Sequence, residues 1–318
     1  MRVLIVGGAG LAGRALIREL LDAGGADITV LSRAASSISG VKRVIVGHYG
    51  ELSRTAEFGR EVAQMDAVVH LADGLPVLEH RTNVSDTALA DRLVAASADL
   101  ASAALEARVP LFAYVSSIKA ICGEEDDRVL VETSKPRATT LYGRSKLRVE
   151  QSLSRAFAGS ATRTVILRPP VLYGEVQRGS LSRLLRLADT PWPLPLGNLT
   201  NKRSVLNLSN LASLLGHLVR NGAPQAQGVF HVHDGPPLST TQIVTALRRG
   251  LGRPRRLFPP AIAGHVARLV PYAAPVARRL YGSLEISDAH LRRSLAWTPV
   301  IDTETALVEM ARRYVVER

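Results

Sequence analysis

Short apolar blocks alternate with longer segments of helical periodicity along the first 170 residues. Blocks bounded by Gly, Arg or Asp predict buried strands, and the longer segments predict helices. This alternation is typical of a parallel sheet with crossover helices, so we predict an α/β fold and exclude all-α and all-β folds. Strands are expected at residues 2–6, 27–31, 41–46, 67–71, 111–115 and 164–167, and helices at 11–23, 86–107 and 139–157.

The pattern becomes less regular after Pro170, where proline-rich and short apolar segments follow one another. We therefore place a first domain at residues 1–170, with about 205–235 as a candidate for a later return to the sheet. Residues 171–318 are expected to form mainly a smaller α/β region. An apolar, arginine-bearing stretch at 259–280 suits either core packing or a membrane surface, although two prolines interrupt any continuous amphipathic helix there.

The composition narrows the class of protein. The chain has 318 residues, of which 46% are hydrophobic, so it can bury a sizeable core. No window approaches the roughly 20 apolar residues that a membrane span needs, and the N-terminus does not resemble a signal peptide. Cys122 is the single cysteine, which excludes an intrachain disulfide or a cysteine cluster. We expect a cytoplasmic protein with no metal and no membrane insertion.

The net charge of +12 points to an anionic partner. Nucleic acid, a membrane surface and small phosphate-bearing ligands all fit such a charge. Basic residues are mostly dispersed, with short clusters at Arg253–Arg256 and Arg278–Arg279, and no nucleic-acid motif accompanies them. We therefore expect small anionic ligands and no nucleic-acid partner.

A glycine-rich segment lies between the first predicted strand and the first predicted helix. Gly7, Gly10 and Gly13 have the spacing GxxGxxG, which lets the backbone turn tightly and approach a pyrophosphate at the helix N-terminus. A purely structural turn would also need glycine, but the strand before and the helix after favour dinucleotide binding. The predicted site consists of Gly7, Gly10, Leu11, Ala12 and Gly13.

The end of the second strand is expected to select the dinucleotide. A carboxylate there binds the ribose 2′-hydroxyl of NAD, whereas a cation binds the 2′-phosphate of NADP. The chain has Leu31, Ser32 and Arg33 at this point and no carboxylate. This favours NADP(H), with NAD(H) as the alternative.

A second group of candidate residues combines a phenol, an ammonium and hydroxyls. Tyr142 and Lys146 are four residues apart, which places them on one face of a helix. A free phenol with a pKa of about 10 is a poor base, but a neighbouring ammonium stabilises the phenolate. Ser116 and Ser117 follow a predicted buried strand, and either could donate a hydrogen bond to a substrate oxygen. A surface Tyr–Lys pair is the alternative.

These motifs resemble the extended short-chain dehydrogenase/reductases of the NAD-dependent epimerase/dehydratase group, over residues 1 to about 310. The resemblance rests on the glycine segment, the Tyr–Lys pair and the stretches 66–72, 115–117, 168–174 and 295–299. It implies a Rossmann-type doubly wound sheet, a smaller C-terminal substrate region and a homodimer.

The resemblance also implies residue roles. Tyr142 would be the acid/base, Lys146 would bind the nicotinamide ribose, and Ser117 would polarise the reacting carbonyl, with Ser116 as the fallback. Further residues are assigned to the cofactor or the substrate. Leu71, Ala72, Arg168 and Pro169 would contact the cofactor, and Lys119 and Arg203 the substrate.

Within the group, the chain is most similar to the UDP-glucose 4-epimerase-like subgroup, which includes C4-reductases of UDP-4-keto-6-deoxy-N-acetylhexosamines. Ile118 and Lys119 replace the Asp–Glu pair of the dehydratases, so dehydration is not expected. Arg33 favours NADPH and thus reduction of a 4-keto sugar. A 4-epimerase with tightly bound NAD is the first alternative, and a non-catalytic dinucleotide-sensing or scaffold protein is the second. Asp73 is an unexpected carboxylate near the cofactor.

Overall fold

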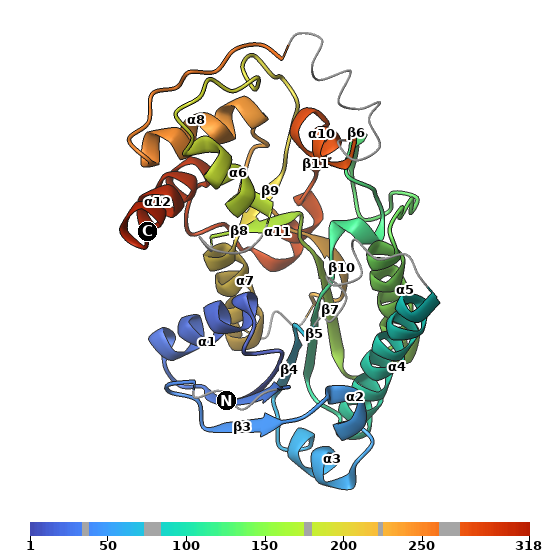
Figure 1. Ribbon diagram of the computed structural model, residues 1–318. Helices are drawn as coiled ribbons and strands as arrows, with labels where there is room; N and C mark the ends of the chain where they lie inside the picture. Colours follow the sequence, from blue (N-terminus) through green and yellow to red (C-terminus); the bar gives the residue numbers. More distant parts are fainter. Residues whose placement is uncertain (34–37, 73–83, 175–179, 222–224, 261–273) are drawn as a thin grey trace.

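A central sheet of seven parallel strands organises the fold (Figure 1). The computed structural model describes residues 1–33, 38–72, 84–174, 180–221, 225–260 and 274–318. The strand order is β10-β7-β5-β4-β1-β2-β3. These strands are β1 (Arg2–Val6), β2 (Asp27–Ser32), β3 (Arg43–Val46), β4 (Ala67–His70), β5 (Leu111–Val115), β7 (Arg163–Arg168) and β10 (Gly228–His231).

The predicted Rossmann-type fold is confirmed. The first and fifth strands have the predicted bounds, and the others differ by one or two residues because strand ends fray into their turns. In the register, Val6 lies beside Leu31 on one side and His70 on the other. All strands therefore end at the same edge of the sheet, where the chain turns into its helices.

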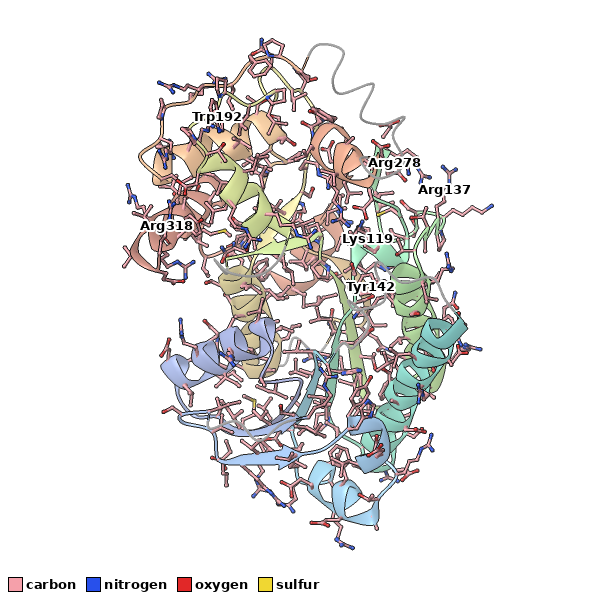
Figure 2. All side chains as sticks on the ribbon, viewed as in Figure 1. Lys119, Arg137, Tyr142, Trp192, Arg278 and Arg318 are labelled. Atoms are coloured by element: carbon pink, nitrogen blue, oxygen red, sulfur yellow. The ribbon has the colours of Figure 1, made fainter. Side chains whose placement is uncertain are left out.

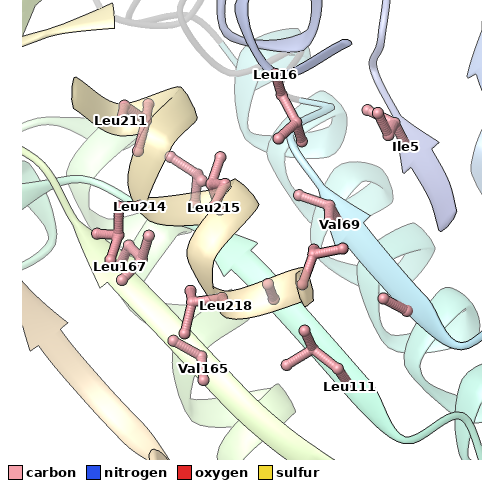
Figure 3. Close-up of a cluster of buried hydrophobic side chains, with 14 of the residues drawn as sticks. Ile5, Leu16, Val69, Leu111, Val165, Leu167, Leu211, Leu214, Leu215 and Leu218 are labelled. Carbon is pink, nitrogen blue, oxygen red and sulfur yellow. The ribbon is translucent and has the colours of Figure 1, made fainter. Parts of the chain in front are cut away.

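Helices cover both faces of this sheet (Figure 1). One face packs against α1 (Leu11–Ala23) and α7 (Leu208–Asn221), and their leucines meet strand residues such as Ile5, Val69 and Val165 in a buried cluster (Figure 3). The other face carries the remaining helices of this half. These are α2 (Tyr49–Leu52), α3 (Ala56–Val62), α4 (Val84–Glu106) and α5 (Leu141–Ala156).

The C-terminal part forms a smaller lobe beyond the edge at which the strands end (Figure 1). Two small parallel pairs lie in this lobe, β8 (Val171–Tyr173) with β9 (Val205–Asn207), and β11 (Leu284–Ile286) with β6 (Asp126–Leu130) from the first half of the chain. Its helices are α6 (Ser180–Ala188), α8 (Thr240–Gly250), α10 (Ala274–Tyr281), α11 (Ala289–Leu295) and α12 (Thr303–Val316).

None of the helices that the structure describes is long and apolar enough to cross a lipid bilayer. Most of the stretch 259–280 lies outside the described residues.

Candidate active site

The glycine turn between β1 and α1 depends on close backbone contacts. Gly7 has a φ of +91°, and a Cβ there would lie 2.7 Å from the Ala72 nitrogen. A Cβ on Gly13 would lie 2.6 Å from the Gly7 carbonyl oxygen. Gly10 precedes α1 without a side-chain cap, so the N–H groups of the first turn, from Leu11 onward, remain for an anion. This turn fits the pyrophosphate of a dinucleotide.

The ends of β4 and β2, the strands on either side of β1, lie at the same edge of the sheet as the glycine turn. Leu71 donates its N–H to the Val6 carbonyl at 2.8 Å, and both Leu71 and Ala72 are half-buried beside the glycine turn. Arg33 follows β2 and is exposed, so its guanidinium is accessible to an anion. The next described residue after Arg33 is Ile38, and Asp73 also lies outside the described residues.

His70 is a fully buried imidazole at the end of β4. Its Nε2 lies 3.1 Å from Ser97 Oγ, whose proton is donated to the Leu93 carbonyl, so Nε2 carries the ring proton. Burial and, secondarily, the charge of Lys146 lower the pKa of His70 to about 3. The ring is therefore neutral at physiological pH and supplies no positive charge to the site.

Tyr142 and Lys146 lie one turn apart at the start of α5. Lys146 is only 1% exposed, and its Nζ donates to the Val115 carbonyl at the end of β5 at 3.0 Å. The same Nζ lies 4.8 Å from the centroid of the Tyr114 ring and 5.9 Å from that of the Tyr142 ring. The ammonium is thus held between β5 and the phenol, where its charge favours the phenolate.

The two serines after β5 differ in their contacts. Ser116 donates its hydroxyl to the Glu150 carboxylate inside the protein. Ser117 begins the short 3-10 helix η2 (Ile118–Ala120), and its Oγ accepts the Lys119 N–H at 3.2 Å. The Ser117 O–H can therefore still donate, whereas that of Ser116 is used. This difference favours Ser117 as the hydroxyl that contacts substrate.

Gly143 explains how α5 approaches this 3-10 turn. A Cβ on Gly143 would lie 2.1 Å from the Lys119 carbonyl oxygen, closer than any non-bonded contact allows. The first turn of α5 also begins with a cap, because Thr140 Oγ1 accepts the Gly143 N–H at 3.0 Å. Because Gly143 has no side chain, the helix that carries Tyr142 can pack closely against the turn that begins at Ser117.

The structure places Arg168 differently from its predicted role in the cofactor site. Its guanidinium forms a two-point ion pair with Glu150, with Nη2 to Oε2 at 2.6 Å and Nε to Oε1 at 3.0 Å. Nη1 donates to the Glu132 carbonyl at 3.4 Å. Both charged side chains are buried, so Arg168 joins β7 to α5 and is not directed at a phosphate. The Pro169 carbonyl accepts the Ile118 N–H at 2.9 Å and thereby holds η2.

The predicted substrate residues Lys119 and Arg203 meet at Glu124. Lys119 Nζ lies 2.6 Å from Glu124 Oε1, and Arg203 Nη1 donates to the Glu124 carbonyl at 3.0 Å. Arg279 binds the same carboxylate through two nitrogens, at 2.7 and 3.0 Å. Burial alone would raise the pKa of Glu124, but Arg279 and Lys119 lower it to about 2. Two cations, Lys119 and Arg279, therefore pair with this carboxylate, and the backbone carbonyl of the same residue holds Arg203 beside them.

A cavity of about 170 Å³ opens beside these arginines. Arg183, Arg203 and Arg279 line it together with Thr240, and the rest of its lining is aliphatic. The aliphatic residues are Val171, Leu181, Leu184, Leu187, Val205, Ile243, Val276 and Leu280. Figure 2 shows Lys119 and Tyr142 close to one another, between the sheet and the C-terminal lobe. Such a pocket suits a ligand that has both an anionic group and an apolar group.

Sequence reasoning missed several residues of this region. Gly143 is a plain helical glycine in the sequence, and nothing near Glu124 or Arg279 indicates that they form an ion pair 155 residues apart. Glu150 was also missed, although its place one turn after Lys146 on α5 is a signal that could have drawn attention to it.

Comparisons with known proteins show the family and several relatives of this chain. The model of the NAD dependent epimerase/dehydratase family matches residues 3–232. A UDP-glucose 4-epimerase of Vibrio cholerae is 25% identical over 98% of this chain and 95% of that protein. An N-acetyl-alpha-D-glucosaminyl-diphospho-ditrans,octacis-undecaprenol 4-epimerase of Escherichia coli O157:H7 is 25% identical over 79% of this chain and 72% of that protein.

Solved structures of similar fold cover nearly the whole chain. UDP-N-acetylglucosamine 4-epimerase from Bacillus cereus has a TM-score of 0.76 at 20% identity, over 99% of both chains. Bordetella bronchiseptica WbmG in complex with NAD has a TM-score of 0.72 at 20% identity, over 100% of this chain and 94% of that one. A human epimerase family protein with NADPH has a TM-score of 0.70 at 20% identity, over 98% and 99%.

Proposed function

Since the chain belongs to the NAD-dependent epimerase/dehydratase family, we propose that it oxidises and reduces C4 of the sugar in a nucleotide sugar, with 4-epimerisation as the net reaction. The observation that carries the proposal is the position of Lys146, whose ammonium is held between the Val115 carbonyl and the Tyr142 ring. This arrangement supports proton transfer by a tyrosine at neutral pH. The names of both 4-epimerase relatives support the choice of net reaction.

Tyr142, Lys146 and Ser117 have separate roles in the proton transfer at C4 of the sugar. Gly7, Gly10 and Gly13 would hold a nicotinamide dinucleotide at the glycine turn, and this group would supply hydride transfer. Tyr142 accepts the proton of the C4 hydroxyl as the sugar is oxidised and returns it as the keto group is reduced. Lys146 stabilises the phenolate, and the Ser117 hydroxyl donates a hydrogen bond to the C4 oxygen. Dehydration is not supported, because Ile118 and Lys119 replace the required acid pair.

The cavity supports a diphosphate-linked sugar as the substrate class. Arg183 and Arg203 provide guanidinium groups that match phosphate oxygens, while the aliphatic lining can cover a base or another apolar group. Arg279 lines the same cavity, and its Nε and Nη2 are paired with the Glu124 carboxylate. Arg203 is buried, and it is held by carbonyls, so its position does not depend on an exposed ion pair. We assign the diphosphate to Arg183 and Arg203 and place the reacting C4 of the sugar at Tyr142.

Replacing Tyr142 by Phe tests this mechanism. Loss of the acid/base is expected to lower kcat on UDP-sugars about 10²- to 10⁴-fold, with KM little changed, because general acid–base catalysis contributes that factor. Tyr314→Phe on α12 is the matched control and should retain full activity. Turnover by Tyr142→Phe at the unsubstituted rate would refute the mechanism, and an inactive unsubstituted protein across UDP-sugars and their 4-keto derivatives would favour the non-catalytic alternative.

Net reduction of a 4-keto sugar is the second candidate, and Arg33 is the observation that favours it. An exposed cation after β2, with no carboxylate beside it, suits the 2′-phosphate of NADPH, which a reductase consumes. Stoichiometric oxidation of NADPH by a 4-keto nucleotide sugar would support reduction. Formation of the C4 epimer with no net change in nicotinamide absorbance would support epimerisation.

A further inference from the structure

Two loops lie side by side at the end of the C-terminal lobe that is remote from the seven-stranded sheet. We call them the Arg/Trp tip, defined as residues 190–194 and 253–258; Figure 2 labels its Trp192. The Leu194 N–H donates to the Arg256 carbonyl at 3.0 Å, and the Phe258 N–H donates to the Leu194 carbonyl at 3.0 Å. The two segments are thus joined along their backbones.

Arg248 of α8 fixes the backbone of the tip from below. It is only 1% exposed, and its Nη1 donates at 3.0 Å to the carbonyls of Pro254 and Arg255. Its Nη2 donates to the Trp192 carbonyl at 2.8 Å. Burying a guanidinium without a carboxylate is costly, so several carbonyls of both loops must stay in place to compensate it. The tip is therefore a rigid structure.

The rigid backbone presents aromatic side chains to solvent. Trp192 is 72% exposed and Phe258 is 46% exposed. Among the described residues these are the only exposed Phe, Trp or Tyr side chains of the protein, and they stand on the two joined loops. Exposed aromatic groups on two joined loops are candidates for a contact surface.

The tip also carries positive charge without acidic partners. Arg255 and Arg256 are exposed, as is Arg186 at the end of α6, and none of the three takes part in an ion pair within the described chain. The carboxylate at the base of the tip, Asp189, is already bonded to Arg253 and to the C-terminal residue. The surface is therefore aromatic and cationic.

We propose that the Arg/Trp tip docks on an anionic lipid bilayer. Tryptophan prefers the boundary between headgroups and acyl chains, and arginines beside it bind lipid phosphates. A protein strand is a poorer occupant, because prolines at 191, 193, 254 and 259 leave the loops few free backbone N–H groups to pair with it. The proposal concerns a surface remote from the glycine turn and does not depend on the reaction.

The two tryptophans of the chain allow a direct test. Trp297 is buried, and its indole N–H donates to Ser213 Oγ at 3.3 Å. Trp297→Phe leaves Trp192 as the only tryptophan, whose fluorescence can be excited selectively over that of tyrosine. Vesicles of phosphatidylcholine with phosphatidylglycerol should move its emission to shorter wavelength and carry the protein upward in a flotation gradient. Vesicles of phosphatidylcholine alone should do neither. Equal binding to both kinds of vesicle, or to neither, would overturn the proposal.

Arginine variants distinguish vesicle binding through the Arg/Trp tip from a general electrostatic attraction between the positively charged protein and the anionic vesicles. Arg255→Ala/Arg256→Ala should weaken binding to the anionic vesicles by about fivefold per cation removed. The control Arg18→Ala/Arg60→Ala removes the same charge from exposed positions on α1 and α3. Unfolding midpoints should agree among all variants. If the control weakens binding as much as the tip variant does, the Arg/Trp tip is not the docking surface.

Trp192→Ser tests the aromatic contribution in the chain that retains Trp297. Flotation on anionic vesicles should fall at least as much as in the double arginine variant, because the indole no longer enters the headgroup region. Trp192→Phe should recover much of the binding. Flotation of Trp192→Ser equal to that of the unsubstituted protein would contradict insertion of this side chain.

Discussion

At the residue scale, a single absent Cβ decides how the candidate catalytic groups meet. Gly143 lies directly after Tyr142, and its Cα faces the carbonyl of Lys119 in the turn begun by Ser117. Any side chain here must move either the helix or the turn, since backbone atoms cannot rotate away as a flexible side chain can. The distance between the Tyr142 and Ser117 side chains therefore depends on this glycine.

Gly143→Ala is expected to lower both stability and activity. The 2.1 Å approach to the Lys119 oxygen requires a backbone shift, and overpacking of this kind costs about 1–3 kcal/mol of the free energy of unfolding. Gly59→Ala is the matched control in α3, where a Cβ meets nothing within 4 Å and helix propensity should raise stability by up to about 1 kcal/mol. Urea unfolding measures both. Equal stabilities of the two variants would contradict the contact.

At the scale of elements, a buried ion pair joins the strands that end at the site to the helix above them. Glu150 on α5 accepts from Arg168 at the end of β7 and from Ser116 after β5. Lys146, one turn earlier on the same helix, donates to the Val115 carbonyl. The helix is thus attached to both strands by charged or polar contacts, which have stricter geometry than apolar packing.

Glu150→Gln is expected to lower the free energy of unfolding by about 3 kcal/mol, because it leaves the buried Arg168 without its counter-charge. Glu304→Gln is the matched control: Glu304 pairs with Arg249, both side chains are 58% exposed, and such pairs contribute at most about 1 kcal/mol. Denaturant midpoints distinguish the two variants. A loss at Glu150 no larger than at Glu304 would show that Arg168 finds another partner.

At the scale of the whole molecule, the C-terminal lobe closes on a segment from the first half of the chain. β6 pairs with β11, and Ile121, Cys122 and Leu130 pack with Leu284 and Ile286 in one buried cluster. The ion pairs around Glu124 cross the same boundary. Glu124 from the first half of the chain therefore holds two of the arginines that line the cavity, Arg203 and Arg279.

The rate at which the Cys122 thiol is labelled tests whether β6 and β11 are paired in the folded protein. It is buried, and burial raises the pKa of its thiol to about 12, so the reactive thiolate is scarce in the folded protein. Labelling by a thiol reagent at neutral pH should be slow in buffer and should accelerate with urea as β6 and β11 separate. Thr200→Cys, at an exposed position, should add one rapidly labelled group. Rapid labelling of the unsubstituted native protein would contradict the closed arrangement.

The sequence by itself determined the parallel sheet and the place of the glycine turn. The bounds of β1, α1 and β5 follow from apolar runs that end at glycines or polar residues, and these signals are local. The spacing of Tyr142 and Lys146 likewise needs only the pitch of a helix.

Only the tertiary structure decided which polar side chains are paired and which partner each of them has. Ser116 and Ser117 are equivalent in sequence, but the first donates to Glu150, 34 residues away. Arg168 is assigned to the cofactor from the sequence, but its guanidinium is paired with Glu150 inside the protein. Arg248 has no distinguishing signal in the sequence, and it is buried beneath the Arg/Trp tip. The physical reason is that a charge or hydroxyl acts through its partners, and these partners come from segments that only folding brings into contact.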